Sequence, residues 1–321
     1  MPLRFILVRH ALAALLALAA AASPAAAQER YVGLITHQTD NASTRLLARA
    51  NVRHAKTTLY WDKWEAEAAY RTTFAEGIQR LVQAKFEITV VVHAAPAGSS
   101  FATRDAVYGR FAAFMRARAA QFPGVRNWQL WNEMDAAGWT DIFGMGQVPI
   151  YEQGRHYATM LRSAYDSIRA SNANARVVIG GLAGPDELLD DFLRGVYDGG
   201  GKFDVIAVHA YGPPIWWAAR DRGDSVRAFM RAKGETRPLW LTEFGISMAR
   251  MRDLWLIPTT AAREEKQRQE WIDVVAWNDT SRVYDRMIGY VLIDATDDGF
   301  GIVRANGVTR PAYGWLQSRN K

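Results

Sequence analysis

The sequence contains no cysteine, and this absence excludes several kinds of chemistry. Neither a disulfide framework, a thiolate nucleophile, a cysteine-ligated zinc site nor an iron–sulfur cluster can form. Other signatures are missing as well. The sequence has no G-x-G-x-x-G or P-loop for nucleotide phosphates, no H-E-x-x-H for a catalytic zinc and no G-x-S-x-G for a serine hydrolase. The sequence therefore gives no sign of a metal or cofactor site.

Blocks of like charge and long hydrophobic runs are also scarce. The net charge of +6 is spread along 321 residues, so the sequence does not predict nucleic-acid binding. One apolar run, Ala11 to Ala22, follows Arg4 and Arg9 and precedes Ala25-Ala26-Ala27. This pattern is typical of a secretory signal peptide, and the run is too short to span a bilayer comfortably. We expect residues 1–27 to be removed, leaving residues 28–321 as one periplasmic or secreted domain without stable membrane insertion.

Eight short apolar or β-branched segments alternate with segments of helical period. Strands that are apolar on both faces are typical of a parallel sheet. Eight strand–helix pairs predict a single (β/α)8 TIM barrel, an α/β fold; an open, doubly wound sheet with the same alternation is the alternative. The predicted strands are Val32–Ile35, Thr57–Trp61, Ile88–Val92, Asn127–Trp131, Arg176–Gly181, Asp204–Ala210, Pro238–Phe244 and Met287–Asp294.

Two glutamates follow apolar runs at the ends of predicted strands. Glu133 completes the run Trp131-Asn132-Glu133 after the fourth strand, and Glu243 lies at the end of the seventh. Reactive side chains of a (β/α)8 barrel stand at this end of the strands, and a carboxylate there is costly unless it is paired or used. Two carboxylates across the barrel mouth suggest glycoside hydrolysis. For each glutamate alone, a helix-favouring position at a strand end is the alternative.

These motifs resemble those of the clan A retaining glycoside hydrolases, in particular families 39 and 5, which share the (β/α)8 barrel. The resemblance implies that Glu133 is the acid/base and Glu243 the nucleophile, with carboxyl groups about 5–5.5 Å apart. It implies that Asn132 holds the sugar 2-hydroxyl. It also matches His209 and Tyr211 to the polar or aromatic residues of strand six, with Tyr211 hydrogen-bonding near the nucleophile.

The sequence departs from the clan at two positions. Many members carry an arginine on strand two that contacts the nucleophile, and the nearest candidate here is Lys56. Many carry a tryptophan on strand eight beneath the reacting sugar, where we expect Leu292. A glycan-binding barrel without turnover is therefore an alternative to a hydrolase. A transglycosylase that uses the same two carboxylates is another.

The chain has 12 tryptophans, whose flat rings can pack against the C–H faces of sugars. We expect those within strands and helices, such as Trp128 and Trp131, to fill the core. We expect contact with an oligo- or polysaccharide from those that follow strand ends, with Trp61 first among them: Trp61, Trp64, Trp139, Trp216, Trp217 and Trp255.

Three other features leave alternatives open. His93, ending the third strand, could donate to a sugar hydroxyl or be a structural histidine. The segment 246–260 could wall a cleft, move as a lid or pack on itself. Three aspartates after the eighth strand could bind calcium, although a hydrated acidic loop is the expectation: Asp294, Asp297 and Asp298.

Overall fold

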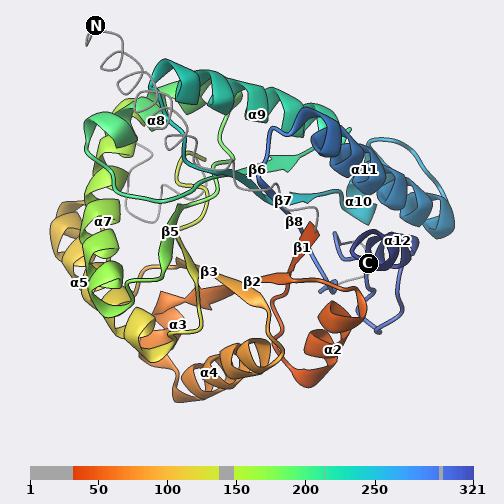
Figure 1. Ribbon diagram of the computed structural model, residues 1–321, viewed down its shortest axis with the longest axis horizontal. Coiled ribbons are helices and arrows are strands. Elements are labelled where there is room, and N and C mark those ends of the chain that lie inside the picture. The colour runs from red at the N-terminus through yellow and green to blue at the C-terminus, as the bar shows by residue number, and fades with distance from the viewer. Residues whose placement is uncertain (1–31, 137–147, 213, 296–298) are drawn as a thin grey trace, which may run out of the picture.

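The computed structural model describes residues 32–136, 148–212, 214–295 and 299–321, and it has the predicted (β/α)8 barrel (Figure 1). Eight parallel strands are ordered β5-β4-β3-β2-β1-β8-β7-β6. Bridges Val178–Val205 and Leu182–Val208 join β5 to β6 and close the ring, which excludes the open-sheet alternative. The strands are β1 (Val32–Ile35), β2 (His54–Tyr60), β3 (Glu87–His93), β4 (Asn127–Leu130), β5 (Arg176–Ile179), β6 (Ile206–Tyr211), β7 (Leu239–Gly245) and β8 (Arg286–Gly289).

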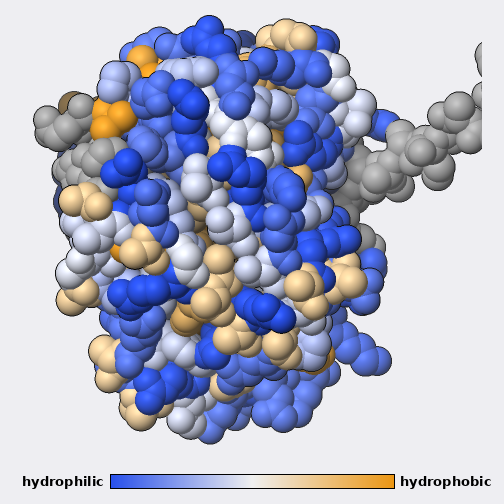
Figure 2. Space-filling model, turned by 90° about the vertical axis from the view of Figure 1, so that its left-hand side faces the viewer, coloured by the Kyte–Doolittle hydropathy of each residue, from blue (hydrophilic) through white to orange (hydrophobic). Residues whose placement is uncertain are grey.

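Helices surround the strands, as Figure 1 shows. They are α2 (Asn41–Arg49), α3 (Trp61–Ala66), α4 (Ala68–Gln83), α5 (Arg104–Gln121), α7 (Ile150–Ser171), α8 (Asp186–Asp198), α9 (Ile215–Ala232), α10 (Met248–Asp253), α11 (Thr260–Ser281) and α12 (Pro311–Arg319). In Figure 2 most of the visible face is hydrophilic, with apolar residues scattered over it. In α8, for example, the residues buried in the core are mainly apolar, among them Leu189, Phe192 and Val196.

Two strand boundaries differ from the prediction in ways that matter for the site. Strand β2 begins at His54, three residues earlier than expected, and Trp61 belongs to α3. The first residues of β2 include His54 and Lys56, which are polar and buried. A search for apolar runs does not find such residues. Strand β8 ends at Gly289, five residues before the expected end.

The core lies inside the barrel and between the strands and the helices. Trp128, Trp131 and Trp271 are fully buried in it, which confirms their predicted packing role. Burying a large apolar side chain contributes about 1.5–3 kcal/mol, so these rings are a substantial part of the fold's stability.

A charged cluster closes the base of the barrel, at the start of the strands. Glu87 Oε1 lies 2.7 Å from Arg176 Nη2 and 2.9 Å from Arg286 Nη1, and it accepts a hydrogen bond from Asn127 Nδ2 at 3.0 Å. The Arg286 guanidinium stacks on Trp240, 4.2 Å from the ring centroid. Burial alone would raise the pKa of Glu87, but Arg286 above all outweighs it and the pKa falls to about 2. These contacts join β3, β4, β5 and β8.

The C-terminal segment returns to the first strand. Asn320 Oδ1 accepts from Val32 N, and Asn320 Nδ2 donates to Val32 O, both at 3.1 Å. Asp294 Oδ2 lies 2.6 Å from Arg310 Nη1, and both side chains are buried. The expectation of a hydrated loop is therefore wrong for Asp294, because its carboxylate neutralises a buried arginine. Asp297 and Asp298 lie outside the described residues.

The predicted signal peptide, residues 1–27, also lies outside the described residues, so its prediction stands untested. Among the helices that the structure describes, none combines the length and the apolar character needed to cross a membrane.

Candidate active site

Glu133 follows β4 at a bend in the backbone. Trp131 and Glu133 both have positive φ, 70° and 51°, and such conformations cost about 1–3 kcal/mol unless the surroundings hold them. Here the Trp131 ring is fully buried. The Asp135 carboxylate accepts from the backbone N–H groups of Ala183 and Gly184, each at 2.9 Å. The loop after β4 is thereby tied to the loop after β5, which fixes Glu133 at the barrel mouth.

Glu243 lies on β7 with a donor on each of its carboxylate oxygens. Lys56 Nζ donates to Glu243 Oε1 at 2.9 Å and to Thr242 O at 3.1 Å, and Tyr211 Oη donates to Glu243 Oε2. Burial alone would raise the pKa of Glu243, but attraction to His209 and Lys56 and these hydrogen bonds lower it from 4.5 to about 2. Glu243 is therefore ionised at neutral pH. The predicted hydrogen bond from Tyr211 is present, and Lys56 contacts the predicted nucleophile.

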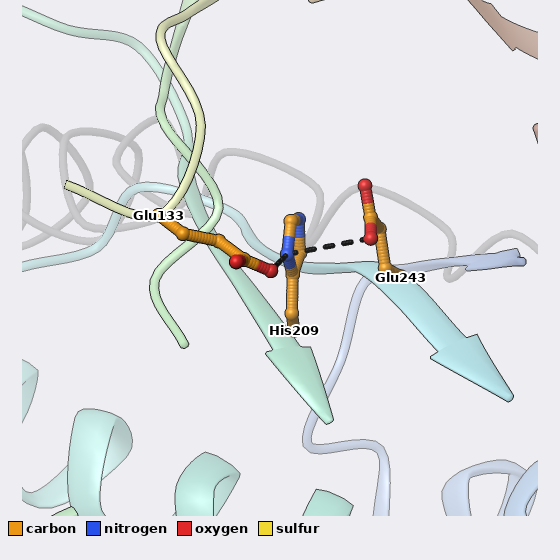
Figure 3. A group of neighbouring side chains, drawn as sticks. All are labelled: Glu133, His209 and Glu243. Atoms are coloured by element: carbon orange, nitrogen blue, oxygen red, sulfur yellow. Dashed lines mark hydrogen bonds and ion pairs between the residues drawn. The ribbon is translucent and has the colours of Figure 1, made fainter. Parts of the chain in front are cut away.

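His209, on β6, stands between the two glutamates (Figure 3). Its Nδ1 lies 2.7 Å from Glu133 Oε1 and 3.5 Å from Glu243 Oε2. Nδ1 is therefore hydrogen-bonded to Glu133, and the tautomer of His209 together with the proton on Glu133 sets which of the two groups donates. The ring packs against Gly181, where an added Cβ would lie only 1.9 Å from His209 Nε2. The absence of a side chain at Gly181 thus makes room for the histidine.

The two carboxylates are close to each other and open to the same mouth. One oxygen of Glu133, one of Glu243 and a ring nitrogen of His209 all lie within 4.8 Å of one another. Such a group could in principle hold a metal ion. However, Lys56 and Tyr211 already donate to Glu243, and His209 Nδ1 is hydrogen-bonded to Glu133. A metal would have to displace these hydrogens beside the Lys56 ammonium, so the arrangement favours a hydrogen-bond network.

A cavity of about 460 Å³ opens over the two carboxylates, within the range of small-molecule sites. It contains five residues that the sequence predicted: His93, Asn132, Glu133, Tyr211 and Glu243. The other residues that line it are His37, Thr58, Tyr60, Val91, Arg250, Tyr290 and Phe300. Burial, partly offset by Asp62 and Glu243, lowers the pKa of His93 to about 4, so this imidazole is neutral at ordinary pH.

Trp61 does not face this cavity. It is 0% exposed, its ring packs against Phe111 and Phe114, and its Nε1 donates to Glu65 Oε1 at 2.7 Å. The expected sugar contact is therefore wrong for Trp61. As the first residue of α3, it turns into the helix layer, where the neighbouring Trp64 is buried as well.

Three more of the predicted tryptophans lie elsewhere or outside the described residues. Trp216 and Trp217 lie in the first turn of α9 and pack edge to face, with ring centroids 5.6 Å apart. Trp217 is 51% exposed, and neither ring is among the residues that line the cavity over Glu133 and Glu243. Trp139 lies outside the described residues. Sugar contact by these three stays a prediction.

An aromatic wall at the cavity was missed in the sequence. Tyr211, Tyr290 and Phe300 pack edge to face with centroid distances of 5.3 to 6.0 Å. Tyr290 occupies the place expected for Leu292, which is fully buried. That expectation is wrong because β8 ends at Gly289. Tyr290 is the first residue after this strand. The expectation that functional side chains follow the strand ends, which identified Glu133, would therefore also identify Tyr290 once the strand is ended at Gly289.

Parts of the chain resemble known proteins in sequence or in fold. A family model described as the glycosyl hydrolase catalytic core matches residues 162–302. The matched segment is less than half of the chain. It includes His209, Tyr211 and Glu243 but not Glu133. No curated protein matches the chain.

Several solved structures share the fold. The chain is similar to an Ignisphaera aggregans GH53 catalytic domain, at 16% identity over 91% of this chain and 97% of that chain, with a TM-score of 0.65. It is similar to a Thermotoga maritima β-glucosidase, at 12% identity over 87% and 85%, with a TM-score of 0.61. A Sorangium cellulosum GH128 endo-β-1,3-glucanase gives 16% identity over 89% and 97%, with a TM-score of 0.54. At these identities the likeness shows the barrel fold.

Proposed function

We propose that this protein is an exported retaining glycosidase that cleaves β-linked oligo- or polysaccharides by double displacement. The observation that carries the proposal is the separation of the two carboxylates, whose nearest oxygens lie within 4.8 Å. Retaining glycosidases hold their carboxyl groups about 5–5.5 Å apart, whereas inverting enzymes leave roughly 6.5–9.5 Å for a water molecule.

The first step forms a covalent intermediate. Glu243, kept ionised by Lys56 and Tyr211, attacks the anomeric carbon while the bond to the leaving oxygen breaks. Glu133 gives its proton to that oxygen. In the second step Glu133 takes a proton from water, and the water oxygen displaces Glu243. Asn132, which also lines the cavity, is placed to hold the 2-hydroxyl of the reacting sugar.

The contacts of Lys56 favour turnover over binding alone. A lysine instead of the clan's arginine was one of the two reasons to consider a non-catalytic barrel, and the missing tryptophan of strand eight was the other. Its ammonium reaches Glu243 at 2.9 Å and lowers the pKa of that carboxyl, which a nucleophile needs. β-Linkage is supported by the β-glucosidase and endo-β-1,3-glucanase among the similar structures. Export is supported only by the pattern of residues 1–27.

The test is hydrolysis of a panel of aryl β-glycosides and β-linked polysaccharides, with the anomer of the first product followed by NMR. We expect the β-anomer to appear first. Azide should rescue Glu133→Ala as a β-glycosyl azide and Glu243→Gly as an α-glycosyl azide, because the two variants remove different steps. An α-anomer as the first product, or full activity in Glu243→Gly, would contradict the proposal. Release of longer glycans than the substrate would indicate transglycosylation.

A further inference from the structure

Among the described residues that line the cavity over Glu133 and Glu243, one arginine has no part in the proposed mechanism. Arg250 lines this cavity, and its side chain is exposed. Lys56 is the cation that contacts Glu243, and it lies buried behind that carboxylate. Among the described residues, no ion pair joins the Arg250 guanidinium to either glutamate. Arg250 is therefore available to a ligand.

Arg250 stands on a helix that is fixed to the barrel. In α10, Met248 and Met251 are buried in the core on either side of Arg250 in sequence. Met248 N donates to Gly299 O at 3.0 Å, and Ser247 Oγ accepts from Arg250 N at 3.1 Å. The segment after β7 thus walls the cavity rather than packing only on itself. Its backbone is pre-organised, which reduces the entropy lost when the side chain binds.

The acid nearest to Arg250 in sequence is already paired. Asp253, at the end of α10, accepts from Arg252, with Nε 2.8 Å from Oδ1 and Nη2 3.3 Å from Oδ2. The same short helix therefore carries one arginine with a carboxylate partner and one that faces the cavity without a described partner. This contrast makes Arg252 a matched control for Arg250.

Among the described residues that line the cavity, the other two side chains that could become cationic are His93 and His37. Burial lowers the pKa of His37, with Glu243 acting in the opposite direction and Lys56 in the same direction. Both histidines are therefore mainly neutral near neutral pH. Among the described residues that line the cavity, Arg250 therefore carries the positive charge at neutral pH. Lys56, behind Glu243, offsets the negative charge of that carboxylate. A ligand anion can approach Arg250 without facing an uncompensated pair of carboxylates.

We propose that the glycan bound in this cavity carries an anionic group, a carboxylate or a sulfate, and that Arg250 pairs with it. A guanidinium presents a planar fork of N–H donors that matches both kinds of oxyanion. This inference rests on the proposed glycosidase function and adds the class of sugar to it. The observation that supports this inference is the position of Arg250. Its guanidinium has no described partner, and its helix is anchored by Met248 and Met251.

The experiment compares wild type, Arg250→Gln and Arg252→Gln on glycans that differ in charge. The probes are hyaluronan and its carboxyl-reduced form, κ-carrageenan as the sulfated glycan, and a neutral β-1,3-glucan. Binding by calorimetry and hydrolysis are both measured, at 20 mM and 300 mM NaCl. Hyaluronan and κ-carrageenan distinguish a carboxylate from a sulfate as the preferred anion.

We expect wild type to bind one anionic probe at least 10-fold more tightly than the neutral glycan, with the advantage reduced at high salt. Arg250→Gln should lose about 10- to 100-fold in affinity or KM for that probe, as expected for a charge-assisted hydrogen bond. Its affinity for the neutral glycan should fall by a smaller factor than its affinity for that anionic probe. Arg252→Gln should behave as wild type throughout.

The outcomes separate this inference from the proposed function. The role of Arg250 is wrong if hydrolysis depends on Glu243 but shows no preference for an anionic probe. It is also wrong if Arg250→Gln keeps the same preference as wild type. In both cases the proposed glycosidase function remains supported. Arg250-dependent binding of an anionic probe without hydrolysis supports the inference and contradicts the glycosidase. If neither anionic probe binds wild type more tightly than Arg250→Gln, the inference is wrong.

Discussion

Replacing Lys56 with methionine should raise the pKa of Glu243. The lysine side chain is 1% exposed, and its Nζ lies 2.9 Å from Glu243 Oε1, so methionine would keep the length and remove the charge. A hydrogen bond to a charged group contributes about 1.5–3 kcal/mol. Since one pKa unit corresponds to about 1.4 kcal/mol, the loss should raise the pKa of Glu243 by about one to two units. Starting from about 2, it should reach roughly 3 to 4.

The sign of the effect on stability follows from the same shift. A carboxyl whose pKa is lowered on folding contributes stability above its unfolded pKa, and this contribution disappears as pH falls through the folded pKa. In Lys56→Met the folded pKa of Glu243 lies closer to its ordinary value of 4.5, so its contribution becomes smaller. The acidic limb of kcat/KM should move upward by the same one to two units.

Carbon-13 NMR of labelled glutamate carboxyls reports the titration of Glu243 directly, whether or not a substrate is known. The matched control is Lys202→Met, which removes an exposed lysine paired with Asp166 at 2.9 Å. Exposed pairs contribute about 0–1 kcal/mol, so this variant should titrate as wild type. An unchanged pKa of Glu243 in a folded Lys56→Met protein would refute the reasoning.

Three further substitutions have expected outcomes. Tyr211→Phe removes the hydrogen bond to Glu243 Oε2 and should lower kcat/KM about 10- to 100-fold, while circular dichroism shows a folded barrel. Gly181→Ala would place a Cβ 1.9 Å from His209 Nε2; displacing that ring should cost about 100-fold in kcat, while circular dichroism shows a folded barrel. Glu87→Gln should lower the free energy of unfolding in urea by about 1–3 kcal/mol and leave kcat unchanged, because it weakens only the cluster at the base.

The barrel and its two carboxylates could be predicted because both depend on local pattern. Runs of apolar residues mark strands that are buried on both faces, and a carboxylate directly after such a run is conspicuous. Glu133 and Glu243 were found in this way. Lys56 and His54 show the limit, because they are buried within the barrel by contacts to distant residues, Glu243 and Thr89. No local pattern reveals a polar residue whose partner is on another strand.

The surroundings of the carboxylates depend on the exact strand ends and on loops. Ending the second strand one residue too late, at Trp61, put this ring at the mouth instead of in the helix layer. Placing the end of the eighth strand five residues too late put Leu292 where Tyr290 lies. Arg250 comes from a short helix that is held by Met248 and Met251, and its position is set by long-range packing that the sequence pattern does not encode.

The pairing of Asn320 with Val32 has a consequence for the order of events during folding. The backbone N–H and C=O of Val32 are both bound by a side chain that lies 288 residues later in the chain. A growing polypeptide cannot make this connection until nearly all of the barrel has been synthesised, and contacts between such distant residues form slowly. The backbone N–H and C=O of Val32 therefore lack this partner until the segment that follows α12 has been synthesised. A chain that ends before Asn320 should unfold at a lower urea concentration than the full chain, because these two buried backbone groups of Val32 lose their partner.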